Sequence, residues 1–121
     1  MITRYNHTQV TVPKGSADEV RRFYGKVLGL REIPVPETMK NYGLIWFRVG
    51  ERDELHVGQE DGIDRRKTKA HLAYEVDDIA AWRRRLKENG IETIDQPKIA
   101  GYDRVHLHDP FGNRIEIIGR D

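Results

Sequence analysis

Apolar and polar residues alternate over short stretches of the chain and recur at helical spacing over two longer ones. In the first half this pattern predicts four strands, at 7–12, 30–35, 44–49 and 54–58. A helix is expected between the first two strands, because Ser16 and Glu19 form a capping-box pattern and Gly29 provides a stop. Its apolar stripe consists of Val20, Phe23, Tyr24, Val27 and Leu28.

The second half repeats this order. Four strands are predicted at 71–76, 91–94, 104–108 and 114–118. A helix carrying Ile79, Trp82 and Leu86 is expected after the first of them, with Asp77 or Asp78 as its N-cap. The pattern therefore predicts a strand, a helix and three strands, twice over.

The two halves also match in detail. Residues 29–33 match residues 90–94 position by position, and residues 44–58 align with residues 104–118 without a gap. Such agreement is typical of an internal duplication. We therefore expect a single α+β domain, 1–121, built from two tandem βαβββ modules. Module one covers about 1–58, a charged linker covers 59–69, and module two covers 70–121.

Composition narrows the classes of function. The chain has 121 residues, 21 basic against 20 acidic side chains, and a net charge of +1, so neither nucleic acid nor a membrane surface is an expected partner. It has no cysteine, which excludes disulfides and thiolate metal sites. No stretch approaches the roughly 20 apolar residues of a membrane span, and a cytoplasmic protein is expected.

The sheet face opposite the helices is predicted to carry unusual chemistry. Alternation along the strands assigns eleven polar or aromatic side chains to it: His7, Gln9, Trp46, Arg48, His56, His71, Glu75, Arg104, His106, His108 and Glu116. All five histidines of the chain are among them. Imidazoles are common ligands of transition metals, so this face is predicted to line a metal-binding pocket.

Four stretches resemble one known family: residues 7–12, 22–30, 71–78 and 109–116. The most specific are FYGKVLGL at 23–30 and DPFGNRIE at 109–116. In these stretches the chain resembles the vicinal oxygen chelate superfamily, also called the glyoxalase/bleomycin resistance/dioxygenase superfamily. The resemblance covers essentially the whole chain. It implies a U-shaped mixed sheet with helices on its outer face, assembly as a homodimer, and a divalent metal held by the first and last strands of each module.

Carried over residue by residue, the implied metal ligands are His7, His56, His71 and Glu116. Glyoxalase I-like relatives commonly have Glu at the position of His56, whereas other branches use only two histidines and one glutamate. The centre is therefore expected to have four protein ligands, with three as the alternative. Zinc, nickel, manganese, cobalt and iron all suit such ligands.

The expected function is a metal-dependent lyase, isomerase or dioxygenase acting on a small molecule with adjacent oxygens. Glu116 is the candidate catalytic base, with Glu75 as a second candidate. The expected substrate-binding residues are Arg104, Trp46, Arg48, His106 and His108. The alternative is a non-catalytic protein that binds an antibiotic or another small molecule, as bleomycin-resistance proteins do. Thiol transfer to fosfomycin ranks last.

Overall fold

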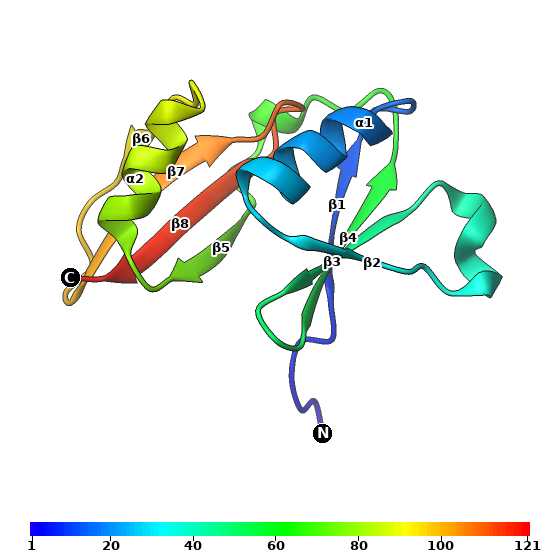
Figure 1. The fold of residues 1–121 in the computed structure, drawn as a ribbon, viewed down its shortest axis with the longest axis horizontal. Coiled ribbons are helices and arrows are strands. Elements are labelled where there is room, and N and C mark those ends of the chain that lie inside the picture. The colour runs from blue at the N-terminus through cyan, green and yellow to red at the C-terminus, as the bar shows by residue number, and fades with distance from the viewer. The chain divides into compact units, whose positions relative to one another are not determined.

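A computed structural model describes all residues from 1 to 121. The chain forms two compact units, Met1–Ile63 and Asp64–Asp121. Each contains a four-stranded mixed sheet. Figure 1 shows the path of the chain through both units. The predicted α+β class and the two modules of like order are confirmed. None of the helices has the length and apolar character that a membrane span requires.

The first unit has the sheet order β1-β4-β3-β2. Its strands are β1 (Thr8–Val12), β2 (Arg31–Ile33), β3 (Ile45–Val49) and β4 (Asp53–Gln59). Its helices are α1 (Ala17–Val20), which continues as the π-helix η1 (Arg21–Val27), and the 3₁₀-helix η2 (Glu37–Tyr42). Strand β1 runs parallel to β4, and the other neighbours are antiparallel.

The second unit has the equivalent order β5-β8-β7-β6. Its strands are β5 (His71–Val76), β6 (Ile94–Asp95), β7 (Tyr102–His108) and β8 (Arg114–Arg120). Its helices are the 3₁₀-helix η3 (Arg65–Lys67) and α2 (Ile79–Glu88). Strand β5 is parallel to β8, which is antiparallel to β7.

Each unit buries one face of its sheet under its helix. The buried apolar residues of the first unit are Val12, Val20, Phe23, Tyr24, Val27, Leu28, Ile45, Phe47, Leu55 and Val57. Those of the second are Ile79, Leu86, Val105, Leu107, Ile115 and Ile117. Along the strands these apolar residues alternate with polar ones on the opposite face, of which His56, His106 and Glu116 are buried as well.

One local prediction needs correction. Ser16 stands at the N-cap of α1, but its side chain makes no capping hydrogen bond, whereas the Asp78 carboxylate accepts one from Ala81 N at 3.0 Å. The stretch predicted as a linker contains η3, in which Arg65 is only 6% exposed. A basic residue in a charged stretch gives no sequence signal of its burial.

Candidate metal centre

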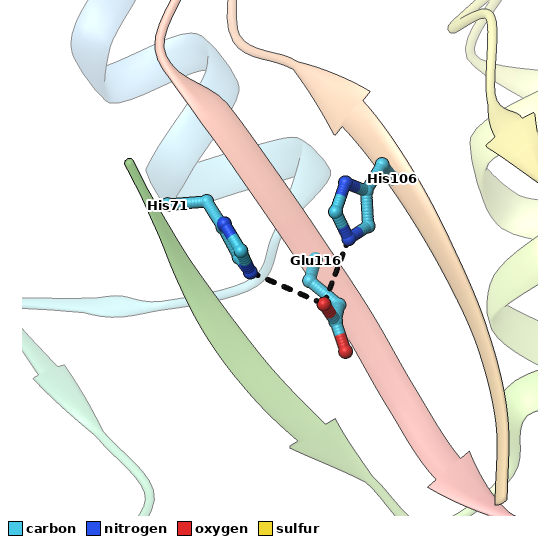
Figure 2. Close-up of side chains that lie close together, drawn as sticks. All are labelled: His71, His106 and Glu116. Carbon is cyan, nitrogen blue, oxygen red and sulfur yellow. Dashed lines mark hydrogen bonds and ion pairs between the residues drawn. The ribbon is translucent and has the colours of Figure 1, made fainter. Parts of the chain in front are cut away.

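Three side chains of the second unit converge on its sheet. They are His71 on β5, His106 on β7 and Glu116 on β8, and their ligand atoms all lie within 4.8 Å of one another. Strand β8 lies between the other two strands, with Glu116 opposite His106 on one side and Ala73 on the other. His71 precedes Ala73 by two residues, so it shares the same face. Figure 2 shows both imidazoles directed at the carboxylate.

The contacts concentrate on one oxygen. Glu116 Oε1 lies 2.7 Å from His106 Nε2, 3.2 Å from Arg104 Nη1 and 3.3 Å from His71 Nε2. The carboxylate and His106 are buried, with side chains 6% and 5% exposed, whereas the His71 side chain is 33% exposed. Two members of the cluster, Glu116 and His106, are therefore shielded from solvent, and His71 is the member that solvent reaches.

The ionisation of Glu116 follows from these neighbours. Burial raises the pKa of its carboxyl, but the hydrogen bond from His106 and the positive charge of Arg104 lower it by more. The pKa therefore lies below the ordinary value, and the group is a carboxylate at neutral pH. A buried anion beside an imidazole nitrogen is a suitable site for a divalent cation.

The ring of His71 is oriented for binding. Its Nδ1 lies 2.9 Å from the backbone oxygen of Lys69, which can only accept a hydrogen bond. When the ring is neutral its proton is therefore on Nδ1, and Nε2, which faces Glu116, is the nitrogen that would bind an ion. Histidines that bind metals commonly donate their other N–H to a carbonyl in this way.

His108, at the end of β7, takes no part in this cluster. Burial lowers the pKa of its imidazole, and the charges of Arg66 and Arg114 lower it further. Arg66 Nη1 lies 3.4 Å from its Nδ1.

The first unit builds a different arrangement on the equivalent strands. The ring of His56 on β4 is stacked between those of Trp46 on β3 and His7, with centroid separations of 3.7 Å and 4.1 Å. The Nε2 of His56 lies 2.9 Å from Glu54 Oε1, and Arg48 Nη1 lies 3.3 Å from the other oxygen of that carboxylate. The hydrogen bond with His56 lowers the pKa of Glu54, and the charge of Arg48 lowers it further against the effect of burial.

The stack limits how His7 and His56, the metal ligands expected in this unit, could bind an ion. The rings of His7 and His56 are only 16° from parallel. An imidazole binds a metal along a lone pair in its own plane, so two stacked rings cannot point at one ion together. His56 also directs Nε2 at Glu54, whereas the Nδ1 of His7 lies 3.0 Å from Asn6 Oδ1, which leaves its Nε2 lone pair open. Of the two, His7 is better prepared to bind metal.

The residues proposed from sequence thus fall into two groups. His71, Glu116, His106 and Arg104 come together in the second unit, and His7, His56, Trp46 and Arg48 come together in the first. Glu75 is exposed on β5. Two partners were not anticipated, Glu54 beside His56 and Arg114, whose Nε lies 2.8 Å from His106 Nδ1. Alternation could have found Arg114, because it lies two residues before Glu116 on the same face of β8.

Comparison with known proteins identifies the family of the chain. The sequence profile of the Glyoxalase/Bleomycin resistance protein/Dioxygenase superfamily matches residues 4–117. "Glyoxylase I 4" of Arabidopsis thaliana is 30% identical over 99% of this chain and 72% of its own length.

Solved structures share the fold. A glyoxalase family protein from Bacillus anthracis is 39% identical, with a TM-score of 0.91 over 100% of this chain and 98% of its own. A mutant of the fosfomycin resistance protein FosX from Listeria monocytogenes, in complex with Mn(II) and 1S,2S-dihydroxypropylphosphonic acid, has a TM-score of 0.81 at 17% identity, over 100% and 95% of the two chains. Since the profile spans nearly the whole chain, the protein belongs to the glyoxalase/bleomycin resistance/dioxygenase superfamily.

Proposed function

We propose that the protein is a divalent-metal-dependent enzyme acting on a small molecule with two adjacent oxygens. The observation that carries the proposal is the pair formed by His71 Nε2 and the Glu116 carboxylate, 3.3 Å apart. Two ligands of one transition metal, each about 2.1 Å from the ion at a right angle, lie roughly 3 Å apart. This pair is therefore already spaced for chelation.

His71 and Glu116 of the second unit are proposed as ligands. His7 and His56 of the first unit are the further ligands that the family resemblance implies, and their stacked rings allow only one of them to bind an ion in this conformation, for which His7 is proposed. The mixture of imidazole and carboxylate fits zinc, nickel, manganese, cobalt or iron better than calcium or magnesium. Such an ion would act as a Lewis acid on the oxygens of a chelated substrate. The Mn(II) in the FosX complex is in keeping with this choice.

The chain's own residues supply binding and proton transfer. Glu116 is the proposed base, since it is ionised and held by His106 and Arg104. Arg104 uses Nε and Nη1 for Pro97 O and Glu116, which leaves Nη2 for an anionic group of the substrate. Lyase, isomerase and dioxygenase reactions all fit these roles.

Metal analysis tests the proposal. Purified protein, stripped and reconstituted with Mn²⁺, Co²⁺, Ni²⁺ or Zn²⁺, should retain stoichiometric metal after desalting. The double variant His71→Ala, Glu116→Ala should lose it, while Glu75→Ala, which removes an exposed carboxylate from the same strand, should not. Failure of the wild-type protein to retain any of these ions would refute the proposal.

A second candidate function is non-catalytic binding of a planar aromatic ligand. It is favoured by the stack of Trp46, His56 and His7, which ends at an exposed ring. In that case a ligand would bind with the same affinity before and after treatment with a chelator. Weakening of binding by the chelator would favour the metal enzyme instead.

Assembly and location complete the proposal. Homodimer formation is proposed from the family resemblance, and a cytoplasmic location from the sequence. Light scattering on the purified protein would establish whether it has the mass of a dimer.

A further inference from the structure

We infer that His106 is not a metal ligand but a positioning residue, and that Arg114 fixes its tautomer so that it donates a hydrogen bond to Glu116. This inference rests on the proposed metal centre and assigns different tasks to three residues that look alike as ligands. The cluster of His71, His106 and Glu116 would then hold a metal through two of its members only.

The first step concerns Arg114. Its guanidinium carries only N–H donors and stays protonated in proteins. Its Nε lies 2.8 Å from Nδ1 of His106, so this ring nitrogen must be the acceptor. A proton on Nδ1 would place two N–H groups against each other at that distance. The ring of His106 therefore carries its proton on Nε2.

The second step concerns Glu116. The Nε2–H of His106 points at Glu116 Oε1 across 2.7 Å, and Arg104 donates to the same oxygen at 3.2 Å. Two donors thus hold Oε1 on the buried side of the cluster. The same oxygen lies 3.3 Å from His71 Nε2, so the donors keep the carboxylate in the orientation from which it would bind an ion together with His71.

The third step is the contrast with His71. That ring donates from Nδ1 to the oxygen of Lys69, so in its neutral form the nitrogen without a proton is Nε2, 3.3 Å from the carboxylate. The two imidazoles drawn in Figure 2 therefore face Glu116 with opposite tautomers. One presents a lone pair and the other presents a proton, so only His71 can bind metal without a rearrangement of the buried hydrogen bonds.

The tautomers can be read directly in the metal-free protein. Two-bond ¹⁵N–¹H correlation spectra of the histidine rings should show a proton on Nε2 of His106 and a proton on Nδ1 of His71. Arg114→Met should shift His106 toward a mixture of tautomers. The matched control Arg84→Met, which removes an arginine from the exposed side of α2, should leave both rings unchanged. A proton on Nδ1 of His106 in the wild-type protein would overturn the inference.

Two amide variants test the consequence for metal binding. Glutamine places a neutral donor near the position of Nε2, whereas asparagine is one methylene shorter and reaches only the position of Nδ1. His106→Gln should keep the affinity for Co²⁺ within a few-fold. His106→Asn should weaken it by about 10- to 100-fold, the usual effect of losing a partner that orients a ligand. If His106 is itself a ligand, both variants will lose affinity as severely as His71→Gln, and the inference is wrong.

The experiments distinguish a failure of the proposed function from a failure of the positioning role of His106. If the wild-type protein binds no metal, the proposed function is refuted, while the tautomer spectra of the metal-free protein still decide the state of His106. If metal binds and His106 carries its proton on Nδ1, the metal centre stands and the positioning role falls.

Discussion

At the scale of single residues, the chemistry of the second unit depends on how one carboxylate is surrounded. Glu116 has a hydrogen-bond donor in His106, a cation in Arg104 and the Nε2 of His71 at 3.3 Å. Burial alone would favour the protonated acid, and the donor and the cation reverse that preference. The carboxylate therefore remains charged although it is enclosed by the sheet.

Removal of the cation should be visible in the titration of this group. Because the charge of Arg104 lowers the pKa of Glu116, Arg104→Met should raise it. The lowered pKa stabilises the fold at pH values above the ordinary value of 4.5, and this stabilisation is lost as the pH falls through the lowered value. Because Arg104→Met raises the pKa of Glu116, the variant should have a smaller stabilisation of this kind. The ¹³C shift of the carboxyl carbon, followed against pH in metal-free protein, measures the change.

Arg84→Met serves as the control for this titration, since it removes the same charge from the surface of α2. It should leave the pKa of Glu116 where it is. An unchanged pKa in Arg104→Met would mean that the guanidinium does not hold the carboxylate in its charged form.

At the scale of secondary-structure elements, the two main helices begin differently although both were predicted to have a polar N-cap. Asp78 accepts a hydrogen bond from Ala81 N, while the hydroxyl of Ser16 makes no such bond and α1 passes into a π-helix after one turn. Only the second helix therefore gains stability from its cap.

A matched pair of alanine variants should separate the two helix starts. Asp78→Ala should lower the free energy of unfolding by about 1 kcal/mol, the usual effect of losing an N-cap bond. Ser16→Ala should change it by less than about 0.5 kcal/mol, as for a surface position without special contacts. Urea unfolding monitored by circular dichroism gives both values, and equal losses would contradict the assignment.

The order of strands and helices could be predicted from the sequence, because alternating and helically spaced apolar residues indicate which positions are buried. The same alternation placed His71, Glu116 and Arg104 on one face, where the structure brings them together. The ring orientations of His71 and His106 and the stacking of His7 on His56 could not be predicted from the sequence, since they depend on side-chain rotation. The burial of Arg65 was missed for a related reason, because no periodic pattern marks a single buried charge.

At the scale of the whole molecule, the duplicated unit has kept its topology and changed its chemistry. Strand orders and pairings correspond between the units. The first unit has an imidazole between an indole and another imidazole, and the second has a carboxylate between two imidazoles. One copy thus has an aromatic stack and the other an anionic centre at the equivalent strands.

Metal binding should stabilise the strands that carry the ligands more than the rest of the chain. An ion at about 100 times its Kd adds roughly 2.7 kcal/mol to the stability of the state that binds it. Hydrogen exchange should therefore slow at β5 and β8 when Co²⁺ or Mn²⁺ is added, and the His71→Ala variant should show no such change. Slower exchange at β1 as well would support His7 as a ligand.

Magnesium at the same concentration is the control for this exchange experiment, since it prefers a shell of oxygen ligands. It should leave exchange in residues 64–121 unaffected. Equal protection by Mg²⁺ and Co²⁺ would show that the effect is not due to binding at an imidazole site.

The parallel pairing of first and last strands also determines when each sheet can form. β1 pairs only with β4, and β5 only with β8, so each opening strand has no partner until the closing strand of its unit has been synthesised. Contacts of such long sequence separation require the closure of a large loop and slow the folding reaction. Because β8 carries Glu116 and pairs with both β5 and β7, the pairing that joins these strands into one sheet also brings Glu116 beside His71 and His106.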